Sequence, residues 1–338
     1  MGEVKNAPLD MREDILRVDH LKMWFPVTKG LLKRTVGHVK AVDDVSFTVS
    51  RGETLGVVGE SGCGKSTLGK CVMRRLRPTD GQVIFNGHDM SGAGAPDLRN
   101  YHREMQMITQ DPYSALDPRM SIRSIVLEGA RIQGVLRVKT EAEKDELAEY
   151  MMSLVGLSPR FLDRYPHEFS GGQRQRINIA RALAVSPSFL ICDEIVSALD
   201  VSIQAQIVKL MMELQEELGL TYIFIGHDLS VVRHISNQIA VMYLGKCVEY
   251  CESKELFKSP VHPYTRALLS AIPVPSIEMR NKKPQIIKGE VTNPINPKPG
   301  CRFAARCPYA DERCRNEEPA LRDVGGGHMV ACHRVAEG

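Results

Sequence analysis

The segment with the clearest chemistry is residues 59–66, which reads Gly-Glu-Ser-Gly-Cys-Gly-Lys-Ser. It follows an apolar run at 55–58, which predicts a buried strand, and precedes a run at 67–73 with a helical pattern. Glycines let the backbone curl so that successive N–H groups face a phosphate, and the helix N-terminus adds to that attraction. Lys65 would reach the β- and γ-phosphates, and the Ser66 hydroxyl would ligate Mg²⁺. The pattern predicts a nucleoside triphosphate site made of Gly59, Ser61, Gly62, Cys63, Gly64, Lys65, Ser66 and Thr67. We also expect the helix dipole to favour a reactive Cys63 thiolate.

Two adjacent carboxylates follow a second apolar run at 189–192. A buried strand would deliver Asp193 and Glu194 together at its carboxyl end. Asp193 is then placed to hold Mg²⁺ beside the phosphate loop, and Glu194 to polarise an attacking water as a general base. The pair predicts hydrolysis of the bound triphosphate.

A second turn suited to phosphate opens a predicted helix at Ser170, Gly171, Gly172 and Gln173. Its backbone amides and the helix dipole would attract phosphate without a lysine.

The elements that must position these residues alternate between strand and helix patterns. Strand patterns lie at 15–18, 41–49, 82–85, 189–192, 221–225, 238–243 and 246–250, and helical patterns at about 120–184 and at 203–218. A basic segment at 29–38 is expected to be a surface loop. This order predicts an α/β fold with a mostly parallel sheet, flanking helices and a helical insert. Beyond residue 273 the composition shifts, which predicts a separate tail module.

Composition limits the class of protein. The chain of 338 residues has a formal net charge of +3, which argues against a polyanion-binding surface. It shows neither a signal-peptide pattern nor an apolar run long enough to span a bilayer, so we expect a soluble chain that meets any membrane through partners.

Together these motifs resemble the ATP-binding cassette (ABC) family. The resemblance implies a P-loop NTPase with an ABC-type nucleotide-binding domain: a RecA-like core, an antiparallel β subdomain and a helical subdomain at about 112–186. In that family the Ser-Gly-Gly corner contacts ATP bound to the opposite subunit. The resemblance also implies that Gln110 senses the γ-phosphate and Mg²⁺, that Asp200 in the 197–200 loop crosses the dimer interface, and that His227 contacts the γ-phosphate and braces Glu194. Phe25 is the implied adenine platform, with Trp24 as the alternative.

A closer resemblance is to the ATPase subunits of bacterial dipeptide and oligopeptide importers, carried by residues 56–67, 165–167, 197–202 and 262–265. It implies an ABC ATPase domain at 12–255 and an oligopeptide-transporter extension at 256–338. The implied partners are a second ATPase subunit, usually a paralogue, and two permease subunits, with an extracytoplasmic binding protein acting indirectly. The chain would then sit peripherally at the cytoplasmic face of the membrane. The rival class is a soluble ABC ATPase acting on nucleic acid or ribosomes.

Two residues depart from the family pattern. Ile195 stands where proline usually follows the catalytic glutamate, and Thr109 where an aromatic residue commonly precedes Gln110. Neither change removes a catalytic group, so we expect activity to persist.

Four of the nine cysteines crowd the last forty residues, at Cys301, Cys307, Cys314 and Cys332. Thiolates suit iron–sulfur clusters and Zn²⁺ alike, although the tight Cys-x2–4-Cys knuckles of zinc modules are absent. Some peptide-importer relatives carry a 4Fe–4S cluster in this tail, and the resemblance implies the same cluster here. Zinc and free or disulfide-bonded thiols remain the alternatives.

Overall fold

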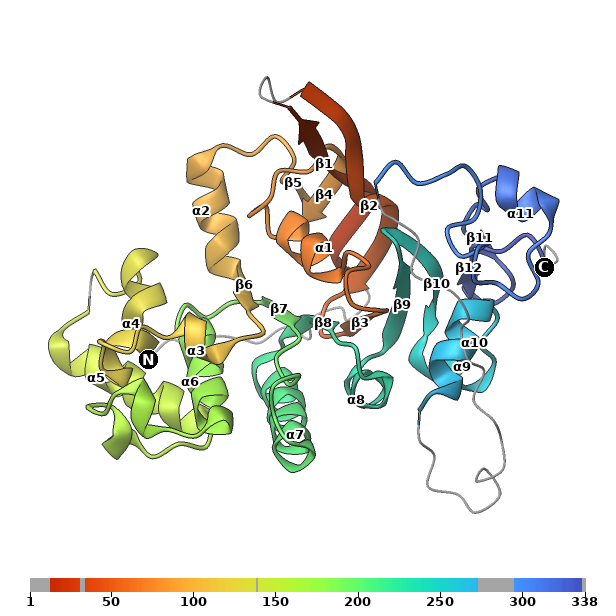
Figure 1. Cartoon of the computed structure of the whole chain (residues 1–338). Coiled ribbons are helices and arrows are strands. Elements are labelled where there is room, and N and C mark those ends of the chain that lie inside the picture. The colour runs from red at the N-terminus through yellow and green to blue at the C-terminus, as the bar shows by residue number, and fades with distance from the viewer. Residues whose placement is uncertain (1–12, 31–33, 138, 273–294, 336–338) are drawn as a thin grey trace, which may run out of the picture.

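The computed structural model describes residues 13–30, 34–137, 139–272 and 295–335. Within these ranges the strands form two sheets, one of four strands in the order β2-β1-β4-β5 and one of eight in the order β11-β12-β10-β9-β3-β8-β7-β6 (Figure 1). No helix in these ranges is both long and apolar enough to cross a membrane.

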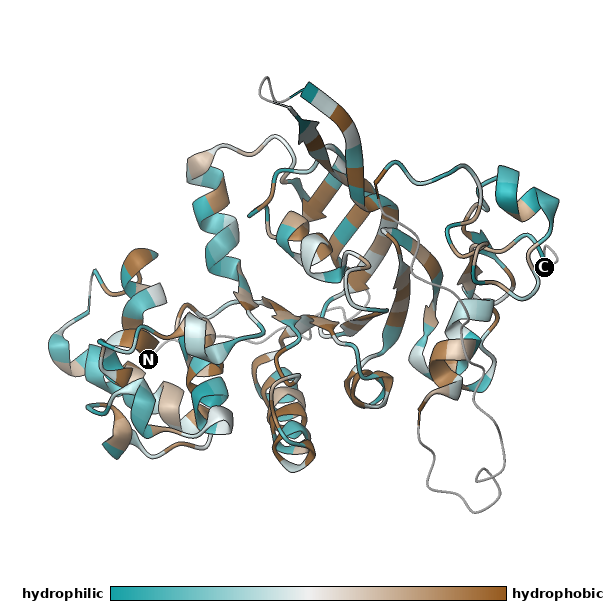
Figure 2. Ribbon diagram, in the orientation of Figure 1, coloured by the Kyte–Doolittle hydropathy of each residue, from teal (hydrophilic) through white to brown (hydrophobic). Residues whose placement is uncertain are grey.

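The centre of the eight-stranded sheet is parallel, as the alternating pattern predicted. Its parallel strands are β3 (Thr54–Val58), β6 (Met105–Ile108), β7 (Phe189–Asp193), β8 (Thr221–Ile225) and β9 (Gln238–Tyr243). Every residue of β3, β7 and β8 is buried, because helices cover both faces of the sheet. The strands are accordingly brown in the hydropathy view, whereas the peripheral helices α2 (Ala95–Glu104) and α11 (Glu312–Asn316) are mostly teal (Figure 2).

The four-stranded sheet is antiparallel and corrects one expectation from the sequence. It is formed by β1 (Asp14–Lys29), β2 (Arg34–Ser50), β4 (Asp80–Phe85) and β5 (His88–Asp89). The segment 29–38 was expected to be a surface loop, but the pairing of β1 with β2 extends to Lys29 opposite Arg34. The ends of β1 and β2 that pair in this segment are exposed. They therefore carry charged residues and lack the apolar alternation that predicts a strand. Residues 31–33 lie outside the described ranges.

The helices divide into those that flank the parallel sheet and a group set to one side of it (Figure 1). The sheet is flanked by α1 (Lys65–Val72), α7 (Val201–Leu218) and α8 (Leu229–Ile235). The separate group contains α3 (Pro112–Ala115), α4 (Ile122–Ile132), α5 (Glu141–Leu154), α6 (Gly171–Leu183) and the 3₁₀ turns η1 (Pro159–Phe161) and η2 (Pro166–Glu168). Thr140 caps α5 through a reciprocal capping box with Glu143, as the sequence indicated.

The C-terminal part adds strands to one edge of the eight-stranded sheet. Here β10 (Lys246–Glu252) pairs with β9 and with β12 (Met329–Val330), which also pairs with β11 (Arg322–Asp323). The helices α9 (Ser253–Lys258), α10 (Pro263–Ser270) and α11 complete this part. We call the described residues 295–335 the C-terminal extension. Residues 273–294 and 336–338, and residue 12 at the predicted domain start, lie outside the described ranges.

Candidate nucleotide-binding and hydrolysis site

The phosphate loop, residues 59–66, joins β3 to α1, and its glycines are required by close backbone contacts. Gly64 has φ +108°, and a Cβ there would lie 1.9 Å from the carbonyl oxygen of Ala41. Gly59 has φ +150°, and its Cβ would lie 2.2 Å from the carbonyl oxygen of Met242. Any larger residue would therefore push the loop away from the sheet. No side chain caps the α1 N-terminus, so its first amides are available to an anion.

Lys65 is buried at the centre of this loop. Its amino group donates to the carbonyls of Gly59 at 2.9 Å and Glu60 at 3.2 Å. It also lies 3.7 Å from a carboxylate oxygen of Glu194. The lysine is thus held where a bound triphosphate would compete for its charge.

Ser66 and Asp193 meet as predicted for a magnesium site. The Ser66 hydroxyl donates to Asp193 Oδ1 at 2.8 Å. Burial raises the pKa of Asp193, and the bond from Ser66 opposes that shift. A hydroxyl and a carboxylate oxygen side by side are ligands that Mg²⁺ accepts in proteins, so these two residues fit the ion.

Glu194 lies directly after β7 in a left-handed conformation with φ +50°. Its backbone N–H donates to the carbonyl of Ile225 at 3.0 Å, which fixes the turn to β8. One carboxylate oxygen lies 3.9 Å from His227 Nδ1. The base predicted from the Asp-Glu pair therefore stands between two basic side chains, Lys65 and His227.

Gln110 and Ser197 connect this turn to the neighbouring segments. Gln110 Nε2 donates to the Ser197 hydroxyl at 3.2 Å, and that hydroxyl donates to the carbonyl of Glu194 at 2.8 Å. Gln110 thus reaches the backbone of the catalytic turn, whereas its role as a magnesium ligand stays a prediction.

The Ser-Gly-Gly corner does not join the phosphate loop within this chain. Ser170 caps α6 through a capping box with Gln173, and Asp200 caps α7 by accepting from the N–H of Ile203 at 3.1 Å. Figure 1 places α6 among the helices away from α1. One chain therefore holds the two predicted phosphate-binding elements apart.

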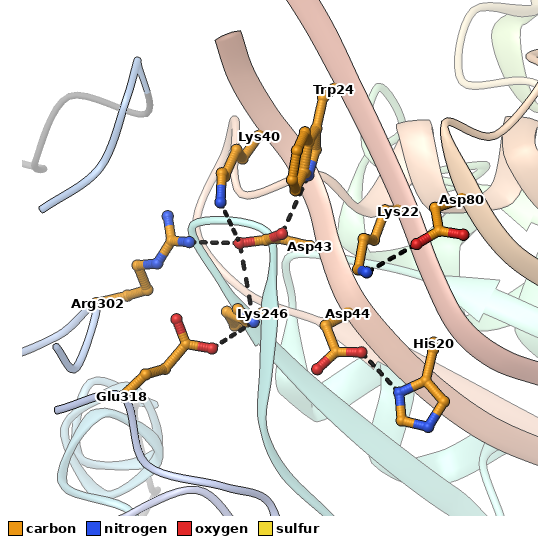
Figure 3. A network of polar contacts seen from close by, with 10 residues as sticks. All are labelled: His20, Lys22, Trp24, Lys40, Asp43, Asp44, Asp80, Lys246, Arg302 and Glu318. Atoms are coloured by element: carbon orange, nitrogen blue, oxygen red, sulfur yellow. Dashed lines mark hydrogen bonds and ion pairs between the residues drawn. The ribbon is translucent and has the colours of Figure 1, made fainter. Parts of the chain in front are cut away.

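Trp24 and Phe25 differ in the contacts that their side chains make. The Trp24 indole N–H donates to Asp43 at 3.0 Å, and the Lys40 amino group lies 4.3 Å from the ring centroid (Figure 3). Neighbouring strand residues point to opposite faces, so Phe25 faces away from this polar cluster. Phe25 therefore stays our prediction for the adenine platform.

The expectation of a reactive thiolate at Cys63 is wrong. Its side chain is buried beside Gly59, and burial is the main influence that raises the pKa of the Cys63 thiol. The charge of Lys65 and nearby backbone hydrogen bonds lower the pKa of Cys63, but less than burial raises it.

The four C-terminal cysteines do not form a metal site in the described structure. In the described ranges no group of three or more His, Cys, Asp and Glu side chains is placed to hold a metal ion. Burial raises the pKa of Cys301 to about 11, which favours a neutral thiol there. The arrangement therefore gives the predicted 4Fe–4S cluster no support. The extension is instead held by packing: Phe303 lies 5.2 Å from Tyr243 and 5.4 Å from Tyr264, measured between ring centroids.

Sequence reasoning missed the residues that tie this extension to the phosphate loop. Arg306 Nη1 donates to Glu60 Oε2 at 2.7 Å, and the Tyr264 hydroxyl accepts from the Glu60 N–H at 2.8 Å. Glu60 occupies a variable position of the motif, so the pattern carried no signal for it. Tyr264 carried a signal only as part of the matching segment 262–265, and Arg306 carried none.

Comparison with known proteins agrees with this geometry. The ABC transporter family model matches residues 42–197, and the model for the oligopeptide/dipeptide transporter C-terminal region matches residues 248–314. The oligopeptide transport ATP-binding protein AppF of Bacillus subtilis is 51% identical over 95% of this chain and 98% of its own length. The probable peptide ABC transporter ATP-binding protein y4tS of Sinorhizobium fredii is 50% identical over 96% of this chain and 90% of its own.

Solved structures match the fold. CbiO1 from Clostridium perfringens, part of the ABC transporter complex cbiONQ, has a TM-score of 0.62 at 28% identity, covering 73% of this chain and 92% of its own. The ATP-binding cassette MJ0796, solved as a dimer with ADP and Pi, has a TM-score of 0.60 at 24% identity, covering 70% of this chain and 98% of its own. The predicted ABC nucleotide-binding fold is confirmed, and the chain is an ABC transporter ATPase that belongs to the family of the oligopeptide transport ATP-binding proteins.

Proposed function

We propose that this chain is the ATP-hydrolysing motor of an importer for dipeptides, oligopeptides or similar small solutes. The observation that carries the proposal is the meeting of Lys65, Ser66, Asp193 and Glu194 at the carboxyl ends of β3 and β7. Lys65 and the loop amides would bind the triphosphate, and Ser66 with Asp193 would hold Mg²⁺. Glu194 would then orient the attacking water and take its proton.

The proposed working unit contains two such ATPase subunits. Within one chain the Ser-Gly-Gly corner at the start of α6 lies apart from the phosphate loop, so each needs a partner to complete a site. ATP would lie between the phosphate loop of one subunit and residues 170–173 of the other, with Asp200 near the interface. The second subunit would be a paralogue or another copy of this chain.

The transported solute is inferred from the relatives. AppF and y4tS are described as peptide transport proteins, and the matched C-terminal region is described in the same terms. Two permease subunits and, indirectly, an extracytoplasmic binding protein complete the proposed machine, with this chain at the cytoplasmic face. The alternative of an ATPase acting on nucleic acid or ribosomes is not favoured, because these relatives carry peptide-transport names.

The proposal does not extend to a 4Fe–4S cluster. Among the described residues, Cys301, Cys307, Cys314 and Cys332 do not form a group that could hold a metal ion, so the predicted cluster is unsupported. The iron and acid-labile sulfide content of anaerobically purified protein is the measurement that decides this point.

Replacing the proposed base tests the function. We expect Glu194→Gln to bind ATP as the unchanged chain does, because the amide keeps the size of the side chain. We also expect it to lose about two to four orders of magnitude in ATP turnover, because it cannot accept the proton. Turnover is measured by phosphate release, with Glu217→Gln, an exposed change on α7, as the control. Near-native turnover by Glu194→Gln would assign the base to another residue.

A further inference from the structure

The strongest link between the C-terminal extension and the nucleotide site is an ion pair inside the phosphate loop. Arg306 lies between Cys301 and Cys307 in the extension, and Glu60 is the second residue of the phosphate loop. The two side chains meet in a fork, with Nη1 to Oε2 at 2.7 Å and Nη2 to Oε1 at 3.0 Å. The Arg306 side chain is only 8% exposed. A bidentate pair in this setting fixes orientation as well as position.

The backbone of Glu60 is held from the same side. Its N–H donates to the Tyr264 hydroxyl at 2.8 Å. Tyr264 is fully buried and packs against Tyr243 and Phe303, at centroid distances of 4.7 Å and 5.4 Å. Because these rings cannot move freely, the hydroxyl is a fixed acceptor for the loop.

The remaining polar group of Glu60 faces the catalytic lysine. Its carbonyl accepts from the Lys65 amino group at 3.2 Å. Glu60 therefore connects the two parts of the molecule: residues 264 and 306 hold its N–H and its carboxylate, and Lys65 binds its carbonyl.

A second path runs from the extension to Cys63, the fifth residue of the loop. The carbonyl of Cys63 accepts from the N–H of Gly245 at 2.9 Å, and the carbonyl of Gly245 accepts from the N–H of Asp43 at 2.8 Å. The Asp43 carboxylate is buried and pairs with Arg302 of the extension (Figure 3). The same figure shows Lys246 beside Asp43 and paired with Glu318 at 2.5 Å. Two residues of the phosphate loop, Glu60 and Cys63, are thus connected to the extension.

We propose that the C-terminal extension holds the phosphate loop in the shape that accepts ATP, and that Arg306 is the positioning residue of this contact. A glycine-rich loop loses much conformational freedom when it closes around phosphates, and ordering it beforehand removes that cost from binding. Because the fork from Arg306 restrains Glu60, it also restrains the carbonyl that Lys65 uses. This inference rests on the proposed role of residues 59–66 in binding ATP.

The test compares ATP affinity of full-length variants, measured by titration with a fluorescent ATP analogue and Mg²⁺. We expect Arg306→Gln to raise the dissociation constant about tenfold, because the two charge-assisted hydrogen bonds that restrain Glu60 are weakened or lost. Arg313→Gln is the matched control, because it removes an exposed arginine of the same extension that pairs with Glu317 at 2.9 Å. We expect its affinity to equal that of the unchanged chain.

A double-mutant cycle separates positioning from general weakening of the fold. Glu60→Gln should weaken ATP binding as much as Arg306→Gln, and the double variant should be no weaker than either single one. Should Arg306→Gln fail to fold, Arg306→Lys takes its place, since lysine keeps the charge and loses the fork. We expect about a threefold loss from that change, an intermediate effect.

Two results would overturn the inference: native ATP affinity in the Arg306 variants, or losses that simply add in the double variant. Lys65→Ala distinguishes this failure from failure of the proposed function. If Lys65→Ala abolishes ATP binding while Arg306→Gln leaves it unchanged, only the role of the extension is wrong. If Lys65→Ala binds ATP normally, the phosphate site itself has been misassigned.

Discussion

Acidification should destabilise this protein through one buried histidine, His262. Its side chain caps α10, with Nδ1 accepting from the N–H of Tyr264 at 3.1 Å. Burial lowers the pKa of His262 from 6.5 to about 3. The neutral ring is therefore the folded form, because a protonated Nδ1 would lose the cap and burial disfavours the charged ring.

The pH dependence of the free energy of unfolding follows from the difference between the folded and unfolded pKa values of His262. The pKa of His262 is about 3 in the folded chain and near 6.5 in the unfolded chain, so the unfolded chain binds one more proton between these values. Its contribution to stability is complete above pH 6.5 and declines as pH falls toward 3, by about 1.4 kcal/mol per pH unit. At pH 5 the expected loss is about 2 kcal/mol.

The perturbation that isolates this effect is His262→Asn. Asparagine is a favoured helix N-cap, so it can still accept from the Tyr264 N–H, yet it does not titrate. Urea unfolding at pH 7.5 and pH 5, followed by fluorescence of the single tryptophan Trp24, gives the free energy of unfolding. We expect the pH-dependent loss to be smaller in the variant by about 2 kcal/mol. His88→Asn, at an exposed position of β5, is the control. An unchanged pH dependence in His262→Asn would refute the reasoning.

Two further predictions concern contacts beside the site. Gly64→Ala should abolish detectable ATP binding in a nucleotide titration, because its Cβ would lie 1.9 Å from the Ala41 carbonyl oxygen and its φ is +108°. Glu249→Gln should lower the free energy of unfolding by about 1–3 kcal/mol in urea titrations. The buried carboxylate accepts from the backbone N–H groups of Val261 at 2.8 Å and His262 at 3.0 Å, and an amide would turn a donor toward one of them.

Matched changes serve as controls for both predictions. Gly87 also has a positive φ, +75°, but has open space around its Cβ direction, so Gly87→Ala should leave ATP binding unchanged. Glu252→Gln alters an exposed glutamate of the same strand as Glu249 and should leave stability unchanged. ATP binding by Gly64→Ala, or native stability of Glu249→Gln, would contradict the respective argument.

The parts of the site that the sequence predicted best are those whose chemistry requires particular residues close together in the chain. Residues 59–66 and the pair Asp193 and Glu194 follow buried apolar strands, and the structure brings Ser66 within 2.8 Å of Asp193 as expected. The hairpin at 29–38 was missed because exposed strand ends carry no apolar alternation. The attachment of the extension was missed for a different reason. Arg306 and Glu60 are 246 positions apart, and no local pattern encodes such a pairing.

In the proposed mechanism, the contacts of Glu194 link nucleotide binding to hydrolysis. The Glu194 carboxylate lies 3.7 Å from Lys65 and 3.9 Å from His227. We expect the side chains of Lys65 and His227 to contact the γ-phosphate. A triphosphate carries more charge than one carboxylate and would draw both side chains toward itself. Glu194 would then be released from its contacts with these two side chains. The left-handed backbone at φ +50° would keep Glu194 beside the γ-phosphate position.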